Sequence, residues 1–123
     1  MLRKSDALLF PVRWHEPFGI AIVEAYTQGL PVIGSQYGSL PELINADTGI
    51  ICKNYEDLLI ALERKENVFD AEKIRTYAES KFSSKKMAQD YVELYKKVIG
   101  GEVLNRSRPK YIGTAHPETL LPF

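Results

Sequence analysis

Short, continuously apolar runs separated by longer helical stretches constrain the fold of this chain more than any other feature. The first run covers residues 7–12, and two further short strands are predicted at 31–35 and 50–52. A run without polar alternation is typical of a strand buried on both faces, as in a parallel sheet covered by helices. The stretch 19–28 is long enough for a helix and ends at Gly29. Apolar residues lie all round this helix, so we expect it to be buried on most sides.

Beyond the second run the chain continues the alternation and then becomes helical. A brief helix is predicted over 40–45, before the third strand, so the order to that point is βαβαβ. Asn54 and Asp70 stand at positions typical of helix N-caps, and a last helix is predicted from about 84 to 99. The apolar stripes of these helices predict core contacts and consist of Leu58, Leu59 and Leu62, then Ala71, Ile74, Tyr77 and Ala78, and finally Met87, Tyr91, Leu94, Tyr95 and Val98.

The predicted fold class is α/β: a partial Rossmann-like parallel sheet of about three strands with helices, followed by a helical C-terminal extension. We assign residues 1–99 to this domain and 100–123 to an irregular tail, because the tail lacks periodicity and contains several prolines. A small basic cluster in the tail consists of Arg106, Arg108 and Lys110. The tail is expected to be loose or docked elsewhere.

Charge and cysteine content exclude several classes of function. The 123 residues carry 16 basic and 16 acidic side chains, so the chain has no net field with which to hold nucleic acid. No apolar run approaches the ~20 residues that a membrane-spanning helix needs, and no signal-peptide pattern is visible. Cys52 is the sole cysteine, which excludes an internal disulfide and a cysteine-based metal cluster. We therefore predict a cytoplasmic protein without nucleic-acid or metal partners.

The loop 13–19 follows a predicted strand and precedes a helix, which is where open parallel sheets bind ligands. The backbone N–H groups of residues 18–20 are candidate donors to a diphosphate, helped by the positive end of the helix dipole. Gly38 and Ser39 open the next helix at the same edge and form a second candidate phosphate-facing turn. Every such unit has a helix N-terminus and most bind nothing, so a purely connecting role stays open.

Glu24 lies about one turn beyond the predicted helix start, among apolar neighbours. An ionised carboxylate buried in such surroundings costs several kcal/mol unless it accepts hydrogen bonds. The vicinal hydroxyls of a ligand would satisfy it, because one carboxylate accepts two donors. The alternative is a helix with one wet edge, on which Glu24 and Gln28 sit in solvent. The residues alone leave both readings open.

Other polar residues near the loop give weaker indications. Glu16 lies either at the mouth of a site or in an ordinary loop, and its position alone leaves this open. His15 is more typical of polar surface than of a general base. The spacing of glycines and histidines matches neither a dinucleotide fingerprint, a P-loop nor a metal site. Cys52 is expected to be an unreactive strand residue, and Glu42 to have a capping or pairing role.

Several spaced motifs together resemble the GT-B-fold glycosyltransferases of group 1, also called family 4. Glu16-Pro17-Phe18-Gly19 followed by Glu24 is similar to the E-x7-E signature of that family. Further similar segments follow in the family's order within residues 6 to about 99: 25–33 with E-A-x-A-x-G-x-P-V-I, 38–42 with G-G-x-P-E, 48–51 with T-G-x-L-V, and Phe82-Ser83 with the start of the closing helix. By this resemblance, residues 1–99 are a partial GT-B C-terminal donor-binding domain.

The resemblance implies a role for each candidate site residue. Glu16, as the catalytic group, would contact the hydroxyls of the donor sugar, and Glu24 the hydroxyls of the ribose. The implied donor-binding residues are Phe18, Gly19, Ile20, Glu24, Gly38 and Ser39. The substrate would be a nucleotide diphosphate sugar, from which the family transfers the sugar with retention of configuration and without a metal ion or cofactor. Cationic side chains and helix dipoles stabilise the leaving diphosphate in such enzymes.

The chain departs from the family pattern in two residues and in extent. Ser39 stands where the family often has a second glycine, and His15 where an acidic or small residue is common. The acceptor-binding N-terminal domain and the phosphate-binding Arg and Lys, which come from the first part of the C-terminal domain, have no counterpart. We therefore expect a donor-binding fragment that is inactive unless a partner chain supplies the rest. The alternatives are a non-catalytic binding module or split subunit, and a self-associating remnant.

The position of Met1 bears on association. It falls only a few residues before the first predicted strand, which predicts truncation inside the family's preceding helix. Such a truncation leaves a sheet edge or an apolar face uncovered, and exposed edges promote pairing between chains. We therefore predict a homo-oligomer.

Overall fold

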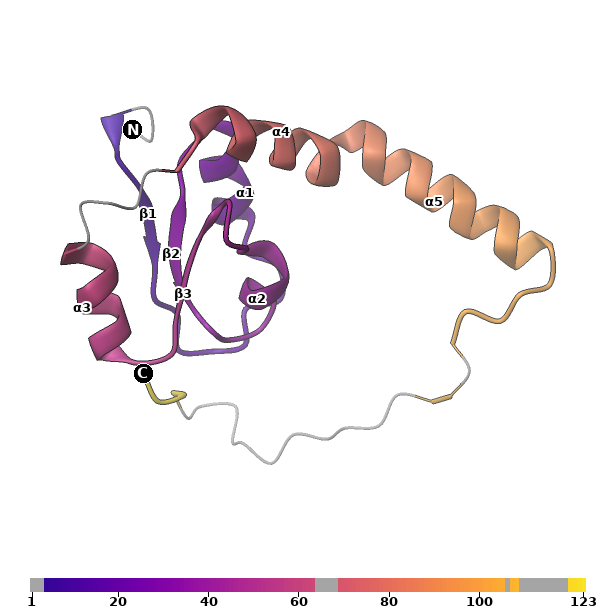
Figure 1. Ribbon diagram of the computed structural model, residues 1–123. Helices are drawn as coiled ribbons and strands as arrows, with labels where there is room; N and C mark the ends of the chain where they lie inside the picture. Colours follow the sequence, from indigo (N-terminus) through magenta and orange to yellow (C-terminus); the bar gives the residue numbers. More distant parts are fainter. Residues whose placement is uncertain (1–3, 64–68, 106, 109–119) are drawn as a thin grey trace.

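Three parallel strands form the sheet of this protein. They are β1 (Leu8–Phe10), β2 (Val32–Ser35) and β3 (Gly49–Cys52), in the spatial order β1-β2-β3. Val32 is paired with Leu8 on one side and with Gly49 on the other. The α/β class, the parallel sheet and the βαβαβ order are therefore confirmed (Figure 1). The computed structural model describes residues 4–63, 69–105, 107–108 and 120–123.

Helices cover both faces of the sheet. On one face lie α1 (Ile20–Thr27), α2 (Leu40–Leu43) and α4 (Ala71–Phe82), and on the other lies α3 (Tyr55–Glu63) (Figure 1). The last helix, α5 (Ser84–Ile99), continues from α4 and extends away from the sheet (Figure 1). Among the described residues, no helix is long and apolar enough to cross a membrane.

Side-chain caps set the start of two helices, as the sequence predicts. The Asp70 carboxylate accepts hydrogen bonds from the backbone N–H groups of Glu72, at 2.9 Å, and Lys73, at 3.2 Å, where α4 begins. The Asn54 side chain accepts from the backbone N–H of Asp57 at 2.8 Å, where α3 begins. A cap of this kind stabilises a helix by about 1 kcal/mol.

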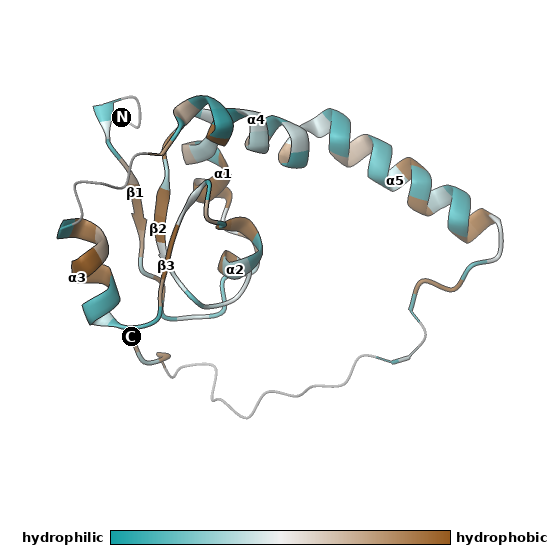
Figure 2. Cartoon of the chain, in the orientation of Figure 1, coloured by the Kyte–Doolittle hydropathy of each residue, from teal (hydrophilic) through white to brown (hydrophobic). Residues whose placement is uncertain are grey.

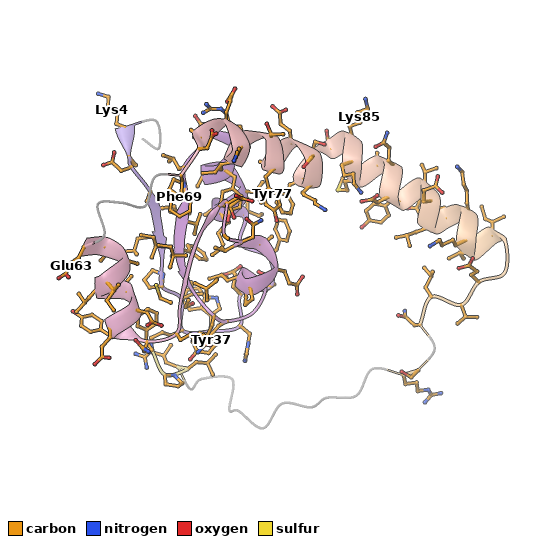
Figure 3. The ribbon with its side chains drawn as sticks, viewed as in Figure 1. Lys4, Tyr37, Glu63, Phe69, Tyr77 and Lys85 are labelled. Carbon is orange, nitrogen blue, oxygen red and sulfur yellow. The ribbon has the colours of Figure 1, made fainter. Side chains whose placement is uncertain are left out.

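Successive residues of the central strand face the two halves of the core. Val32 belongs to a larger cluster and Ile33 to a smaller one, because neighbouring strand residues point to opposite faces. Phe69 and Tyr77 pack against the larger cluster from the side of α4 (Figure 3). The buried members of the larger cluster are Val12, Ile22, Ala25, Tyr26, Leu30, Val32, Leu40, Leu43, Ile44, Ile74 and Ala78, and those of the smaller are Ile33, Cys52 and Ala61.

Two elements are less buried than their sequences predict. β1 is an edge strand in which Leu9 is 46% exposed, so the expectation of a strand buried on both faces is wrong here. α1 buries only one side: Ile22 and Tyr26 are buried, whereas Ile20 is 68% exposed. An apolar residue is buried only where another element covers it, and the described part of the chain places none over these surfaces.

The three predicted helical stripes differ in how far they are buried. On α4 the prediction is confirmed, because Ile74 and Ala78 are buried. On α3 it is only partly right: Leu59 and Leu62 are exposed, and the buried residue is Ala61. On α5 the prediction of core contacts is wrong, and Figure 2 shows hydrophobic residues, in brown, along a helix that projects from the sheet. The exposed residues of this α5 stripe are Met87, Tyr91, Leu94, Tyr95 and Val98.

Part of the predicted tail is docked on the sheet. The backbone at 102–105 has no regular structure. Residues 120–123 lie at the edge of the sheet where the strands end (Figure 1). Of the predicted basic cluster, Arg106 and Lys110 lie outside the described residues, and Arg108 is exposed.

Candidate functional site

The two candidate turns lie in contact at the carboxyl edge of the sheet. The Ser39 backbone N–H donates to the Glu16 carbonyl at 2.9 Å, and the Ser39 hydroxyl donates to the Phe18 carbonyl at 2.9 Å. Gly38 has a φ of 62°, and a Cβ at this position would lie 2.3 Å from the backbone N and O of Glu16. Only glycine allows this approach. The parallel topology therefore brings together the turns that the sequence singled out separately.

Glu16 is bound within its own loop. Its carboxylate accepts hydrogen bonds from the Gly19 backbone N–H and from the Trp14 indole N–H, each at 3.1 Å. Gly19 is the N-cap of α1 and has a φ of 83°, which side chains rarely adopt. The Gly19 amide, predicted to donate to a diphosphate, thus already has an anionic partner. That partner lies at the positive end of the α1 dipole.

The first turn of α1 keeps other amides available. The Ile22 N–H is bonded to the Gly19 carbonyl at 2.9 Å. The N–H groups of Ile20 and Ala21 have no backbone acceptor among the described residues, as is usual at a helix start. An anion can therefore still be bound by the start of α1, through Ile20 and Ala21 rather than through Gly19.

Three predicted site residues line one cavity of about 610 Å³ on the outward side of α1: Phe18, Ile20 and Glu24. The Glu24 side chain is exposed, so burial gives no reason to require a ligand partner for it. Its surroundings match the wet-edge alternative, at the rim of a largely apolar hollow. The other lining residues are Val23, Thr27, Lys81, Phe82, Met87, Asp90, Tyr91 and Leu94.

A row of aromatic rings connects this cavity to the core. Tyr26 contacts Tyr77 with ring centroids 5.9 Å apart, Tyr77 contacts Phe82 at 5.7 Å, and Phe82 contacts Phe18 at 6.0 Å. All three pairs are edge to face, a geometry that stabilises by about 0.5–1.5 kcal/mol per pair. Figure 3 shows Tyr77 between α4 and the sheet. The position of Phe18 is thus fixed by packing as well as by its loop.

Buried polar side chains form hydrogen bonds between the elements that carry the site, and the sequence analysis did not predict them. The fully buried Tyr26 hydroxyl contacts the Leu43 carbonyl and the Thr48 hydroxyl, each at 3.2 Å. Burial raises the pKa of Tyr26 to about 12, although the hydrogen bond with Thr48 opposes this shift. The buried Ser35 hydroxyl donates to the Val12 carbonyl at 2.6 Å and joins the ends of two strands. The available sequence signal was a polar side chain among apolar neighbours, because such a side chain must find a hydrogen-bond partner when it is buried.

Further polar residues at the site also went unpredicted. Lys81 and Asp90 line the cavity beside Glu24, but they lie far from it along the chain, so no linear spacing could reveal them.

His15 is exposed and makes an edge-to-face contact with Tyr37, with centroids 6.1 Å apart, which fits the surface role expected of it. Cys52 is 1% exposed, and burial raises the pKa of its thiol, as suits an unreactive strand residue.

The chain is therefore a Rossmann-like α/β protein with a candidate ligand site where the start of α1 meets the carboxyl edge of the sheet. The sequence profile of the family described as "Glycosyl transferases group 1" matches residues 1–81. The chain therefore belongs to the group 1 glycosyltransferases. The family resemblance that the motifs indicated is confirmed.

Curated relatives are similar over most of this chain. It is 35% identical over 103 residues to an uncharacterised 41.2 kDa protein of the cps region in Klebsiella pneumoniae, which covers 76% of this chain and 27% of that protein. It is 31% identical over 107 residues to N-acetyl-alpha-D-glucosaminyl L-malate synthase of Bacillus anthracis, and the match covers 80% of this chain and 28% of that protein. Spore coat protein SA of Bacillus subtilis (strain 168) is 31% identical over 104 residues, covering 76% and 27%. The chain thus spans about a quarter of the length of these relatives.

Proposed function

We propose that this chain binds the nucleotide diphosphate sugar donor of a retaining glycosyltransferase of the GT-B type. The observation that carries the proposal is the contact between the Glu16 loop and the Gly38-Ser39 turn at the start of α1. Beside that contact lies the cavity lined by Phe18, Ile20 and Glu24. Family membership supports a donor substrate of this class.

The proposed contacts divide the donor among three groups. The free N–H groups of Ile20 and Ala21 and the dipole of α1 would bind the diphosphate, and they would stabilise the charge that develops on it during transfer. Glu24, at the cavity rim, would accept hydrogen bonds from the ribose hydroxyls. Glu16 would contact the sugar with the carboxylate that now binds Gly19 and Trp14. No metal ion or cofactor enters the proposal.

Transfer itself is proposed to require a second domain. A GT-B enzyme acts in the cleft between two domains, and this chain spans about a quarter of the length of its relatives. The acceptor and the remaining cationic groups would then come from a further domain or partner chain. The cytoplasm is the proposed location, because the chain's one cysteine is a free thiol.

The test is a calorimetric titration of the chain with a panel of UDP-, GDP- and ADP-sugars. Glu24→Ala should weaken binding roughly 10- to 100-fold, because each hydrogen bond to a charged group contributes about 1.5–3 kcal/mol. Glu79→Ala, which removes an exposed carboxylate of α4 outside the cavity, should leave binding unchanged. Binding by neither the unaltered chain nor its variants would contradict the donor-binding function.

We also infer that the chain forms a homo-oligomer through the α5 stripe. All five stripe residues are exposed, and three of them, Met87, Tyr91 and Leu94, line the cavity. Monomeric proteins rarely leave a continuous apolar surface of this kind uncovered. A second copy of α5 offers the matching surface, since a two-fold interface places the same patch on both subunits.

A further inference from the structure

The segment 120–123 is bound to the carboxyl edge of the sheet by its backbone. The Leu121 N–H donates to the Arg13 carbonyl at 2.9 Å, and the Arg13 side-chain Nε donates to the Leu121 carbonyl at 2.7 Å. The next carbonyl, that of Pro122, accepts a hydrogen bond from the Tyr37 hydroxyl. Figure 3 shows Tyr37 next to the end of the chain. Polar groups of two different loops therefore bind consecutive residues of one segment.

The side chains of the segment alternate as those of an extended peptide do. Leu121 and Phe123 are half-buried, and Phe123 packs against the smaller cluster. Leu120 and Pro122 are exposed. Alternation with a period of two residues is the property of an extended backbone. Proline, which lacks an N–H, is at an outward position where no donor is used.

This arrangement matches a known mode of peptide recognition. Main-chain hydrogen bonds supply part of the affinity, and a pocket for alternate side chains supplies the specificity. Here the main-chain partners are Arg13 and Tyr37, and the apolar surface that Phe123 packs against is the smaller cluster of Ile33, Cys52 and Ala61. We call these five residues the carboxyl-edge notch.

We propose that the carboxyl-edge notch is a peptide-binding site whose occupant is the chain's own segment 120–123, and that this contact holds the two loops of the candidate donor site together. Arg13 lies in the loop that carries Glu16, and Tyr37 directly precedes Gly38. The bound segment thus bridges both loops beside the hydrogen bond that already joins Ser39 to Glu16. This inference goes beyond the donor-binding function and does not depend on it.

Amide hydrogen exchange in the full-length chain, followed by NMR, tests the proposal without any ligand. The Leu121 amide should exchange at least tenfold more slowly than the exposed Val103 amide, because its N–H is bonded to Arg13. Phe123→Ala should remove most of this protection. Leu120→Ala is the matched control, since it removes an outward-facing side chain of the same segment and should leave the protection intact.

The same experiment reports on the loops and on folding. In Phe123→Ala the Ser39 amide should also exchange faster, whereas the Ile74 amide in the core of α4 should not change. Tyr37→Phe, which removes only the donor to Pro122, should lower Leu121 protection by about 2- to 10-fold. An unprotected Leu121 amide in the unaltered chain, or equal losses in the Phe123 and Leu120 variants, would overturn the proposal.

The occupant of the notch is identified by dilution. An intramolecular segment should give Leu121 protection that is independent of protein concentration. Protection that falls on dilution would show a second copy of the chain in the notch and would contradict the intramolecular contact. Because no nucleotide sugar is present, this outcome is independent of whether the donor-binding function is correct.

Discussion

Among single residues, Gly38 and Tyr26 have requirements that only their neighbours explain. Gly38 must be glycine because the Glu16 backbone lies where a Cβ would be. Tyr26 holds its hydroxyl inside the core, between Leu43 and Thr48. Both positions are set by contacts between segments distant in sequence. Each of them yields a prediction about stability.

Gly38→Ala should lower the free energy of unfolding by more than about 2 kcal/mol, because it adds a backbone clash to the cost of a positive φ. Gly101→Ala is the matched control: its φ is 88°, but nothing lies within 4 Å of the added Cβ. That variant should lose only the cost of the positive φ, about 1–2 kcal/mol. Urea unfolding followed by circular dichroism measures both. Equal losses would show that Gly38 is needed only for its φ.

Tyr26 should make stability depend on alkaline pH. The unfolded chain loses the phenolic proton near its ordinary pKa of 10.0, and the folded chain near the pKa of about 12. Between these values the folded state binds more protons, so the free energy of unfolding falls as pH rises, by at most about 1.4 kcal/mol per pH unit. Below that window the contribution is fully present.

Urea unfolding at about pH 9 and about pH 11.5 separates this effect from other titrations. Tyr26→Phe should flatten the fall in stability across the window, and at the lower pH it should cost about 0.5–1.5 kcal/mol for the lost hydrogen bonds. Tyr55→Phe alters a tyrosine that is 60% exposed and should keep the dependence of the unaltered chain. The same slope in all three proteins would rule out a role for Tyr26.

Among the helices, α5 is the one whose apolar stripe is left exposed, although its sequence predicts core contacts. Its N-cap is satisfied, because the Ser83 hydroxyl accepts from the Lys86 N–H at 3.3 Å, and its stripe has helical spacing. Yet none of its residues is buried in the described structure. Most of the stability of a helix in a protein comes from the packing of its apolar face, so the stability of α5 depends on what packs against it.

Charge placed on the α5 stripe should abolish self-association. In sedimentation velocity the unaltered chain should sediment as a species larger than its 14.0 kDa monomer. Tyr91→Lys should shift it toward the monomer, because a lysine there would have to be desolvated in the interface. Gln89→Lys adds the same charge at an exposed polar position of α5 and should have no effect. A monodisperse monomer for the unaltered chain would contradict the homo-oligomer.

In the molecule as a whole, the loops and the helix start at the carboxyl edge of the sheet account for the proposed donor binding. The carboxyl edge holds the Glu16 loop, the Gly38-Ser39 turn and the start of α1, which are the parts proposed to bind a donor. The chain is proposed to bind the sugar donor and not the acceptor. We therefore expect it to bind a nucleotide sugar without transferring the sugar.

A chain that binds a nucleotide sugar should still not transfer the sugar by itself. With a bound donor identified by titration, product formation with added acceptors should stay at background if, as proposed, a second domain supplies the other wall of the cleft. Chromatographic detection of released nucleotide diphosphate measures this. Sugar transfer by the chain alone at rates typical of enzymes, about 1 s⁻¹ or more, would show that no second domain is needed.

Local sequence signals are enough to predict the order and type of the elements. The local signals are the apolar runs, the caps at Asn54 and Asp70, and the motif spacing from Glu16 to Glu24. The strands form at the apolar runs, and both caps make their hydrogen bonds in the structure. The parallel order also followed, because crossover helices leave the carboxyl ends of the strands at one edge. That topology is why the Glu16 loop and Gly38 could be expected to meet.

Which apolar or charged side chains are covered depends instead on contacts between segments that are distant in sequence. Periodicity shows which face of a helix is apolar, but burial depends on elements that come from elsewhere in the chain. For this reason Leu9 and the α5 stripe are exposed, Glu24 stands in solvent at a cavity rim, and the Glu16 carboxylate binds Gly19. The contact of segment 120–123 with Arg13 and Tyr37 has the same origin, since its hydrogen bonds join residues 108 and 85 positions apart in the sequence.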